Sequence, residues 1–136
     1  ADALIMAAAP ADYRPANVAS QKMKKASGTD VPTIELTQTE DILKSTLAAR
    51  PKGAVVVGFA LETENLLENG KAKLEQKSLD LIVANSAVEE GAGFGGDTNR
   101  VTIIGRNGVN EEIALMKKTE LADIILDRVE SLLNGR

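Results

Sequence analysis

Lysine side chains are the first candidates for chemistry in this sequence. Lys22, Lys24 and Lys25 form a compact basic group beside residues 26–30, which read Ala-Ser-Gly-Thr-Asp and are typical of a mobile loop. Ammonium groups attract phosphate oxygens, so such a loop could close over a phosphorylated ligand. The competing interpretation is a solvated run of like charge, which is the commoner reason for a cluster of this kind.

Lys73 and Lys77 lie one turn apart on a predicted helix and share a stripe with Gly70. Glycine inside a helix costs about 1 kcal/mol relative to alanine, so we expect another group to approach the helix closely at Gly70. The alternative is that both lysines are ordinary surface residues paired with Glu68 or Glu75.

Acidic side chains stand next to two predicted elements. Asp12 follows a predicted strand, where its carboxylate could accept hydrogen bonds from the hydroxyls of a bound sugar, although capping a turn explains it equally well. Glu40 and Asp41 lie in the first turn of a predicted helix, where negative charge favours the helix dipole without any other role. The neighbouring backbone amides could nevertheless bind a ligand.

The sequence contains three aromatic residues, Tyr13, Phe59 and Phe94, and none lies in the middle of a helical stripe. Each follows or ends a predicted strand. In an open parallel sheet the ligand crevice forms beyond the carboxyl ends of the strands. The ring of Phe59 could therefore face a flat ligand such as a base, or it could close the end of the core.

Residues 91–96 read Gly-Ala-Gly-Phe-Gly-Gly and match the pattern Gly-x-Gly-x-x-Gly. A dinucleotide-binding motif of this form needs a strand directly before it and a helix directly after it. This segment follows Val-Glu-Glu and leads into a predicted strand. We therefore interpret it as a mobile loop and not as a dinucleotide site.

Composition excludes several classes of function. The 136 residues include no cysteine and no histidine, which excludes disulfides, thiolate nucleophiles, zinc held by Cys or His, and Ser-His pairs, and we expect no metal ligands in the chain. A net charge of −4 argues against nucleic acid or an anionic membrane as partner. The longest apolar run, residues 3–10, is far shorter than the roughly 20 residues of a membrane span. We expect a cytoplasmic protein.

The elements that must position these side chains indicate one α/β domain over residues 1–136. Residues 3–9, 54–60 and 79–84 are apolar runs without polar alternation, and they predict three strands buried on both faces. Strands of this kind are typical of a parallel, Rossmann-like core between two layers of helices.

A short antiparallel extension is also predicted. Residues 101–105 and 111–115 flank Asn107-Gly108, which is a strong hairpin signal. Another short strand is expected at residues 33–36.

Three helices are predicted between and after the strands. A capping box beginning at Thr37 starts the first, which ends before the Pro-Lys-Gly at residues 51–53. Thr63 is the expected N-cap of the second helix, which reaches about Ser78. Apolar residues at helical spacing predict the third over residues 119–133.

Five motifs in order resemble a known family, the phosphopantothenate–cysteine ligase (phosphopantothenoylcysteine synthetase) domain. This domain is often the carboxyl-terminal half of the bifunctional flavoprotein of coenzyme A biosynthesis. The motifs are Ala-Ala-Pro-Ala-Asp-Tyr-Arg-Pro at 8–15, Lys-Met-Lys-Lys at 22–25, Val-Gly-Phe-Ala-Leu-Glu-Thr at 57–63, Lys-Leu-Glu-Gln-Lys at 73–77 and Asp-Leu-Ile-Val-Ala-Asn at 80–85.

The resemblance implies a CTP-dependent ligase. Bacterial members activate 4′-phosphopantothenate as an acyl-cytidylate with release of pyrophosphate, and the amine of cysteine then displaces CMP. Mg²⁺ accompanies CTP, and FMN belongs only to a decarboxylase domain to which the ligase can be fused. The family also implies a homodimer.

By the same resemblance, Lys22 is the catalytic lysine of a flap and also contacts the nucleotide. The implied CTP-binding residues are Met6, Ala7, Ala8, Asp12, Lys22, Glu40, Asp41, Ile42, Leu43, Phe59, Lys73 and Lys77.

The sequence departs from the family at two places. Pro10 stands where Val is more frequent, and Thr-Glu-Asp at 39–41 replaces the frequent Asn-Pro-Asp. The Gly-rich phosphate segment and the active-site Asn of the family would precede residue 1, so we expect this chain to be the carboxyl-terminal portion of the domain and incomplete as an enzyme. The alternatives are a non-catalytic nucleotide-binding or interaction module on the same fold, and a fragment of a nicotinamide-dependent oxidoreductase.

Overall fold

The computed structural model describes residues 1–23, 33–86 and 96–135 of the chain. Three short strands precede the first helix, and two longer strands follow with a helix between them. A hairpin and a long helix come last among the described elements. The elements in chain order are β1 (Ala3–Met6), β2 (Tyr13–Pro15), β3 (Leu36–Gln38), α1 (Ile42–Ser45), the 3₁₀ turn η1 (Leu47–Ala49), β4 (Val55–Glu62), α2 (Leu66–Gln76), β5 (Leu81–Ser86), β6 (Thr98–Gly105), β7 (Asn110–Lys117) and α3 (Lys118–Asn134).

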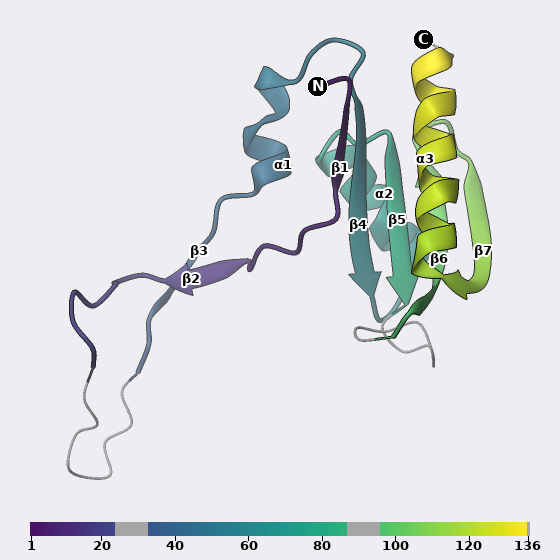
Figure 1. Cartoon of the computed structure of the whole chain (residues 1–136). Coiled ribbons are helices and arrows are strands. Elements are labelled where there is room, and N and C mark those ends of the chain that lie inside the picture. Colours follow the sequence, from purple (N-terminus) through teal and green to yellow (C-terminus); the bar gives the residue numbers. More distant parts are fainter. Residues whose placement is uncertain (24–32, 87–95, 136) are drawn as a thin grey trace.

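The described strands form a main sheet in the order β1-β4-β5-β6-β7 (Figure 1). β1, β4 and β5 are parallel, and the β6–β7 hairpin extends the sheet in the antiparallel direction. Gly108 in the hairpin turn has φ of 83°, a left-handed conformation that glycine adopts without a steric penalty. The predicted parallel core and its antiparallel extension are therefore confirmed.

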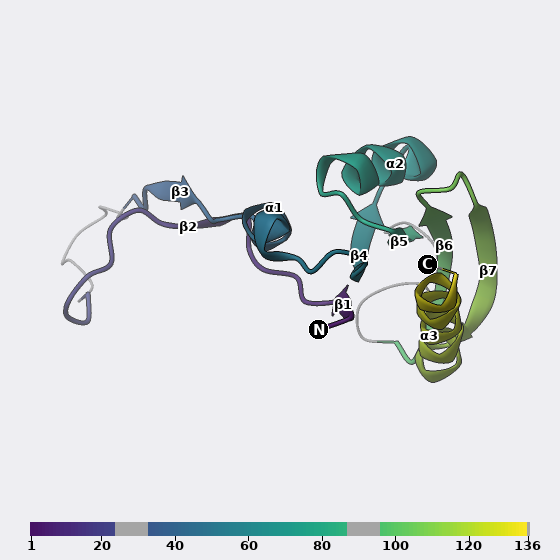
Figure 2. The same cartoon turned by 90° about the horizontal axis from the view of Figure 1, so that it is seen from above.

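Helices cover both faces of this sheet, so the domain has three layers (Figure 2). On one face, Leu121, Ile125 and Val129 of α3 pack on buried strand residues such as Val83. These three residues recur every four positions, which places them on one side of the helix. The third predicted helix is thus confirmed.

The second helix, α2, covers the opposite face, where Leu74 packs with Ile82 and Ile104. A Cβ atom at Gly70 would lie 2.5 Å from Cδ1 of Ile104, so a larger residue would force the helix or the side chain of Ile104 to shift. The close approach expected at this glycine is confirmed, and the approaching group is the sheet itself.

The predicted start of α2 is wrong. The helix begins at Leu66, because β4 continues to Glu62 and the chain uses the next three residues to reverse direction. Asn65 occupies the N-cap position with φ of 50° and makes no side-chain capping bond, and Thr63 does not cap the helix.

β1 differs from the strand predicted over residues 3–9. It spans only Ala3–Met6, and Leu4 and Ile5 are 39% and 38% exposed. Within the described sheet β1 pairs with β4 alone, and it therefore forms an edge. The expectation that this strand is buried on both faces is wrong. An apolar sequence shows that a strand can be buried, but it does not show whether the strand lies at the centre or at the edge of the sheet.

β2 and β3 form a separate antiparallel ribbon that extends away from the main sheet (Figure 1). Thr37 pairs with Arg14 in this ribbon, so the capping box expected at Thr37 is wrong. The helix that follows begins at Ile42 with Asp41 as its N-cap, and it is short, with η1 in place of its predicted second half. The strand expected at 33–36 overlaps β3 only at Leu36.

Candidate functional site

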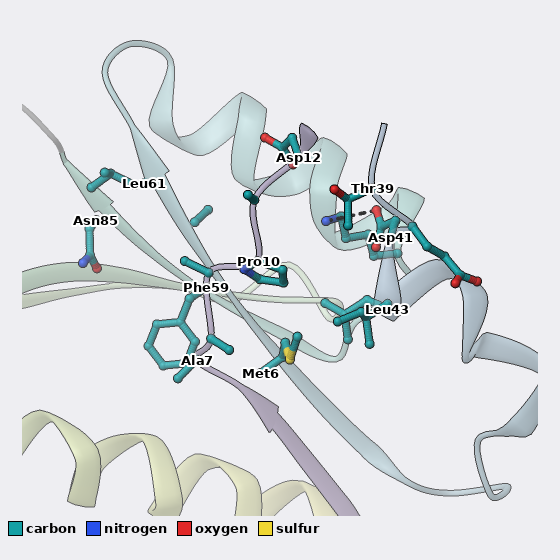
Figure 3. A pocket seen from close by; sticks show the side chains of 17 residues that line it. Met6, Ala7, Pro10, Asp12, Thr39, Asp41, Leu43, Phe59, Leu61 and Asn85 are labelled. Carbon is teal, nitrogen blue, oxygen red and sulfur yellow. Dashed lines mark ion pairs between the residues drawn. The ribbon is translucent and has the colours of Figure 1, made fainter. Parts of the chain in front are cut away.

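A cavity of about 350 Å³ lies at the carboxyl ends of β1 and β4 (Figure 3). The segments before β2 and after β3, which lie at the same end of the ribbon, form part of its wall together with the start of α1. Residues of β1, β4 and β5, and Lys77 at the end of α2, form the rest. The lining residues are Met6, Ala7, Ala8, Ala9, Pro10, Ala11, Asp12, Thr39, Glu40, Asp41, Ile42, Leu43, Phe59, Ala60, Leu61, Lys77 and Asn85.

Strand direction explains why these segments meet. β1 and β4 are parallel, so the chain leaves both at the same edge of the sheet, which is where open α/β sheets hold their ligands. The backbone N–H of Thr39 donates a 2.8 Å hydrogen bond to the carbonyl of Asp12. This bond joins the segment after β1 to the segment before α1.

Asp41 is a carboxylate of the cavity wall that is held by two contacts. Its Oδ1 accepts a 3.2 Å hydrogen bond from the backbone N–H of Lys44, and its Oδ2 lies 3.2 Å from Nζ of Lys77. Partial burial raises the pKa of Asp41, but the hydrogen bond from Lys44 and the ammonium of Lys77 outweigh burial and hold the pKa below its ordinary value. One carboxylate therefore starts α1 and anchors a lysine from α2.

The two lysines of α2 have different surroundings. Lys77 lines the cavity, whereas Nζ of Lys73 lies 2.6 Å from Oε1 of Glu62, outside the lining. Glu62 is 9% exposed and also accepts a hydrogen bond from the side chain of Asn69. The alternative interpretation paired these lysines with Glu68 or Glu75 of their own helix. In the structure both lysines form ion pairs with carboxylates from other elements.

Phe59 and Asn85 lie on one side of the segment that follows β1, and Thr39 and Asp41 lie on the other (Figure 3). Phe59 is 39% exposed although its neighbours Gly58 and Ala60 are buried. Its ring forms part of the cavity wall. The alternative that Phe59 only closes the core does not describe this position.

Most of the predicted site residues are brought together by the fold. Every residue predicted to bind the nucleotide lines the cavity except Lys22 and Lys73. Lys22 is exposed and lies outside the cavity lining. Lys24, Lys25, the loop at residues 26–30 and the glycine-rich segment with Phe94 lie outside the described residues, apart from Gly96.

Sequence reasoning missed several lining residues. Ala9, Pro10 and Ala11 continue a segment already chosen, so simple adjacency could have found them. Asn85 gave a weaker signal, because it is a polar residue at the end of a buried strand. Ala60 and Leu61 lie within the motif at 57–63, and Thr39 lies beside Glu40 in the segment at 39–41, but none of the three was chosen as a site residue.

Two further findings concern the described residues. They include no group of three or more Asp and Glu side chains arranged to hold a metal ion. Within the same part of the chain, no helix has the length and apolar character needed to cross a membrane.

Known proteins are similar in sequence to this chain over nearly its whole length. A family model described as the DNA/pantothenate metabolism flavoprotein C-terminal domain matches residues 1–133. The chain is 44% identical over 131 residues to the coenzyme A biosynthesis bifunctional protein CoaBC of Bacillus subtilis (strain 168), a match that covers 96% of this chain and 32% of that protein. It is 41% identical over 133 residues to a cysteine/cysteine sulfinic acid decarboxylase of an unknown prokaryotic organism, with 98% and 36% covered.

A solved structure is similar over nearly the whole chain. The crystal structure of the C-terminal domain of CoaBC has a TM-score of 0.73 and 34% sequence identity, and the match covers 99% of this chain and 56% of that one. The chain spans about a third of the length of the curated relatives named above.

Proposed function

The chain belongs to the DNA/pantothenate metabolism flavoprotein C-terminal domain family, the family of the phosphopantothenate–cysteine ligase domain, and from that premise we propose that its cavity binds CTP. The proposed reaction joins 4′-phosphopantothenate to cysteine in coenzyme A biosynthesis. An acyl-cytidylate is the intermediate, and 4′-phosphopantothenoylcysteine, CMP and pyrophosphate are the products.

The observation that carries this proposal is the composition of the cavity wall. A flat ring, a lysine, and carboxylates beside exposed backbone surround a space of about 350 Å³, which lies within the usual range for small-molecule sites. In the proposed complex Phe59 lies against the base and Asp12 accepts hydrogen bonds from ribose hydroxyls. Lys77 stabilises phosphate charge as pyrophosphate leaves.

Two lysines outside the cavity need a further step in this proposal. Lys22 is proposed as the catalytic lysine of a flap, which would have to move toward the cavity to reach the nucleotide. Lys73 would have to leave Glu62 and move to the cavity before it could bind phosphate, whereas Lys77 lines the cavity while it is paired with Asp41. We therefore expect Lys73 to contribute less than Lys77.

Mg²⁺ is proposed to enter with the triphosphate. The described residues hold no cluster of acids that could bind the ion alone, whereas Mg²⁺ commonly needs only one or two carboxylates besides phosphate oxygens and water. Glu40 is the lining carboxylate that could serve, since Asp12 contacts the ribose in the proposed complex and Asp41 is paired with Lys77. The ion would neutralise phosphate charge.

A homodimer is the proposed assembly, and the ribbon supports it. Val18 is 86% exposed, Ile34 64% and Leu36 60%, and a two-stranded ribbon alone is marginally stable in water. A second copy of the chain could cover these apolar side chains. Because the curated relatives include bifunctional CoaBC proteins, we also propose that the chain is fused to a decarboxylase domain, which would contain FMN. The proposed location of the protein is the cytoplasm.

Calorimetric titration of the purified chain with CTP tests the binding proposal. ATP and NAD are the comparison ligands, because a general nucleotide module or an oxidoreductase fragment would prefer one of them. We expect Lys77→Ala to weaken CTP binding by about 1.5–3 kcal/mol, the usual scale for a hydrogen bond to a charged group. Lys71→Ala, exposed on the same helix, is the matched control and should change binding by less than about 0.5 kcal/mol. Equal losses of CTP affinity in both variants would mean that Lys77 acts by general electrostatic attraction and not by a specific contact.

A further inference from the structure

Arg50 is a partly buried residue that lies outside the cavity lining and that the proposed reaction does not use. It follows η1, and its Nη1 donates to the backbone carbonyls of Lys77 and Ser78, at 3.2 and 3.0 Å. Its Nη2 donates to the backbone carbonyl of Leu43. Lys77 and Ser78 follow α2, whereas Leu43 belongs to α1, so one side chain joins the two helices.

The partners of this guanidinium show what it holds in place. All three are backbone carbonyls, and no carboxylate in the described part of the chain forms an ion pair with Arg50. Its Nε is buried without a partner, which adds to the cost of removing the side chain from water. Carbonyls at the end of a helix lack a partner inside the helix, and a planar guanidinium can donate to several of them at once. Arg50 therefore fixes the backbone and does not neutralise a charge.

The end of α2 is a conformation that needs such support. Ser78 has φ of 50°, in the left-handed region that residues other than glycine adopt at a cost. The backbone N–H of Leu79 donates to the carbonyl of Leu74, which is the closing bond of a Schellman motif, where glycine is the usual residue at the position of Ser78. The carbonyls of Lys77 and Ser78 belong to the two peptide groups that flank Cα of Ser78. By holding both, Arg50 holds this turn.

The turn carries a charge of the cavity wall. Lys77 lines the cavity, and its Nζ lies 3.2 Å from Oδ2 of Asp41, the N-cap of α1 (Figure 3). α1 has only four residues, too few to be stable without contacts to the rest of the protein. The bonds of Arg50 and the pair between Asp41 and Lys77 are thus two links between the same helices, one outside the cavity lining and one within it.

We propose that Arg50 is a positioning residue, which fixes the end of α2 against α1 and so sets the place of the Lys77 ammonium in the cavity. Without its three bonds the turn at Ser78 relaxes, and the ammonium occupies a wider range of positions. Arg50 itself does not touch the nucleotide. This inference rests on the proposed function, because it takes the phosphates of CTP as the group that Lys77 meets.

A substitution that keeps the charge tests this role. Arg50→Lys replaces the planar fork by a single ammonium, and calorimetric titration should show CTP binding weakened about three- to tenfold, the scale of one hydrogen bond. Arg106→Lys is the matched control, because Nε of Arg106 donates a 3.0 Å hydrogen bond to the carbonyl of Leu79 from the turn between β6 and β7. It should leave the affinity within about twofold. Equal losses in the two variants would overturn the positioning role.

A double-mutant cycle tests whether Arg50 acts through Lys77. In a chain that carries Lys77→Ala, Arg50→Lys should change the affinity for CTP by less than about twofold, because the side chain that Arg50 positions is absent. A loss of the same size with and without Lys77 would mean that Arg50 affects binding by another route, and it would overturn the proposal.

A glycine substitution separates positioning from the stability of the fold. Glycine adopts the left-handed conformation without a steric penalty, so adding Ser78→Gly to Arg50→Lys should recover the midpoint of urea denaturation that Arg50→Lys loses. The affinity for CTP should stay low, because glycine does not restore the link to α1. Recovery of both the midpoint and the affinity would assign Arg50 to the fold alone and overturn its positioning role.

A measurement without ligand keeps this inference apart from the proposed function. Partial burial raises the pKa of Asp41, but the hydrogen bond from Lys44 and the ammonium of Lys77 hold that pKa below its ordinary value. NMR titration of the Asp41 carboxyl carbon should show the pKa rising in Arg50→Lys and unchanged in Arg106→Lys. A pKa that stays the same in Arg50→Lys would overturn this inference alone. A wild-type chain that shows the expected pKa response and fails to bind CTP would overturn the proposed function and leave the link between the helices in place.

Discussion

The main sheet buries its apolar side chains, whereas the β2–β3 ribbon leaves them exposed. In β4 the side chains of Val55 and Val57 are completely buried, whereas every residue of β2 is exposed and Val18 beyond it is 86% exposed. The sheet is covered on both faces by helices of the same chain (Figure 2). The ribbon has no such cover within the described residues.

The difference indicates that the two regions derive their stability from different sources. Burial of apolar surface stabilises the sheet at about 25 cal/mol per Å², while a two-stranded ribbon gains little of this without a partner. The cavity lies where the regions meet, since Asp12 and Thr39 flank the ribbon and Phe59 and Asn85 belong to the sheet. Ligand binding would therefore link the two.

The largest expected effect compares isoleucines from the two regions. Ile82 is 1% exposed in the core under α2, and Ile82→Ala should lower the free energy of unfolding by about 2–5 kcal/mol. Ile34 is 64% exposed, and Ile34→Ala should lower it by less than about 0.5 kcal/mol in the monomer. Urea denaturation followed by far-UV circular dichroism measures both, and comparable losses would mean that the ribbon is part of the core.

Two glycines sharpen the comparison at backbone level. Valine at Gly70 would clash with the buried side chain of Ile104, so that α2 or this side chain must shift, and we expect Gly70→Val to destabilise the fold by about 1–3 kcal/mol. No described atom lies within 4 Å of a Cβ built at Gly96, so Gly96→Val is the matched control and should be nearly neutral. The same denaturation experiment distinguishes them, and a stable Gly70→Val would show that α2 can shift without cost.

Asp41 stands between the two regions, at the start of α1. Asp41→Ala removes the helix cap and the partner of Lys77, and should cost about 1 kcal/mol at neutral pH, while Asp123→Ala on the exposed face of α3 should cost less than about 0.5 kcal/mol. The pKa of Asp41 is lowered in the folded protein, so its contribution is complete above the ordinary value of 3.8 and is lost as the pH falls below that value. The difference between wild type and variant should shrink accordingly, and a difference that grows on acidification would contradict this assignment.

The smallest expected effect concerns the surface of the sheet region. Arg128 of α3 donates two hydrogen bonds, of 3.0 and 2.8 Å, to the carboxylate of Glu111 on β7. The hydrogen bonding lowers the pKa of Glu111 despite slight burial, so the pair stabilises the fold above the ordinary value of 4.5 and is lost as the pH falls below it. Glu111→Gln should cost under about 1 kcal/mol at pH 7, because the pair is partly exposed, and added salt should reduce that cost. A cost of Glu111→Gln that does not change with salt would indicate that the side chain stabilises the fold by packing and not by its charge.

The elements that could be predicted from sequence are those whose pattern depends on local contacts. The spacing of Leu121, Ile125 and Val129 specifies α3, and Asn107-Gly108 specifies the hairpin. Thr37 has a good capping pattern, but its backbone pairs with Arg14 in the ribbon, and pairing between distant residues has no local signature.

The same limit applies to the site. The positions of Lys73 and Lys77 on α2 differ by one turn, and only the packing of Glu62 and Asp41 decides which lysine faces the cavity. Whether the side-chain oxygen of Asn85 has a hydrogen-bond partner depends on residues from several elements, so only the three-dimensional structure shows that it has none among the described residues.

The long separation between β1 and its partner has a consequence for the order of folding. Ala3 pairs with Val55, so this ladder closes a loop that contains the whole ribbon and α1, whereas β6 and β7 join through a short turn. Because the entropy of closing a long loop opposes early contact, we expect β1 to dock after β4 to β7 have assembled and to detach first. The part of the cavity wall that follows β1 would form when β1 docks and open when it detaches. A ligand that contacts both β1 and β4 would therefore slow the detachment of β1.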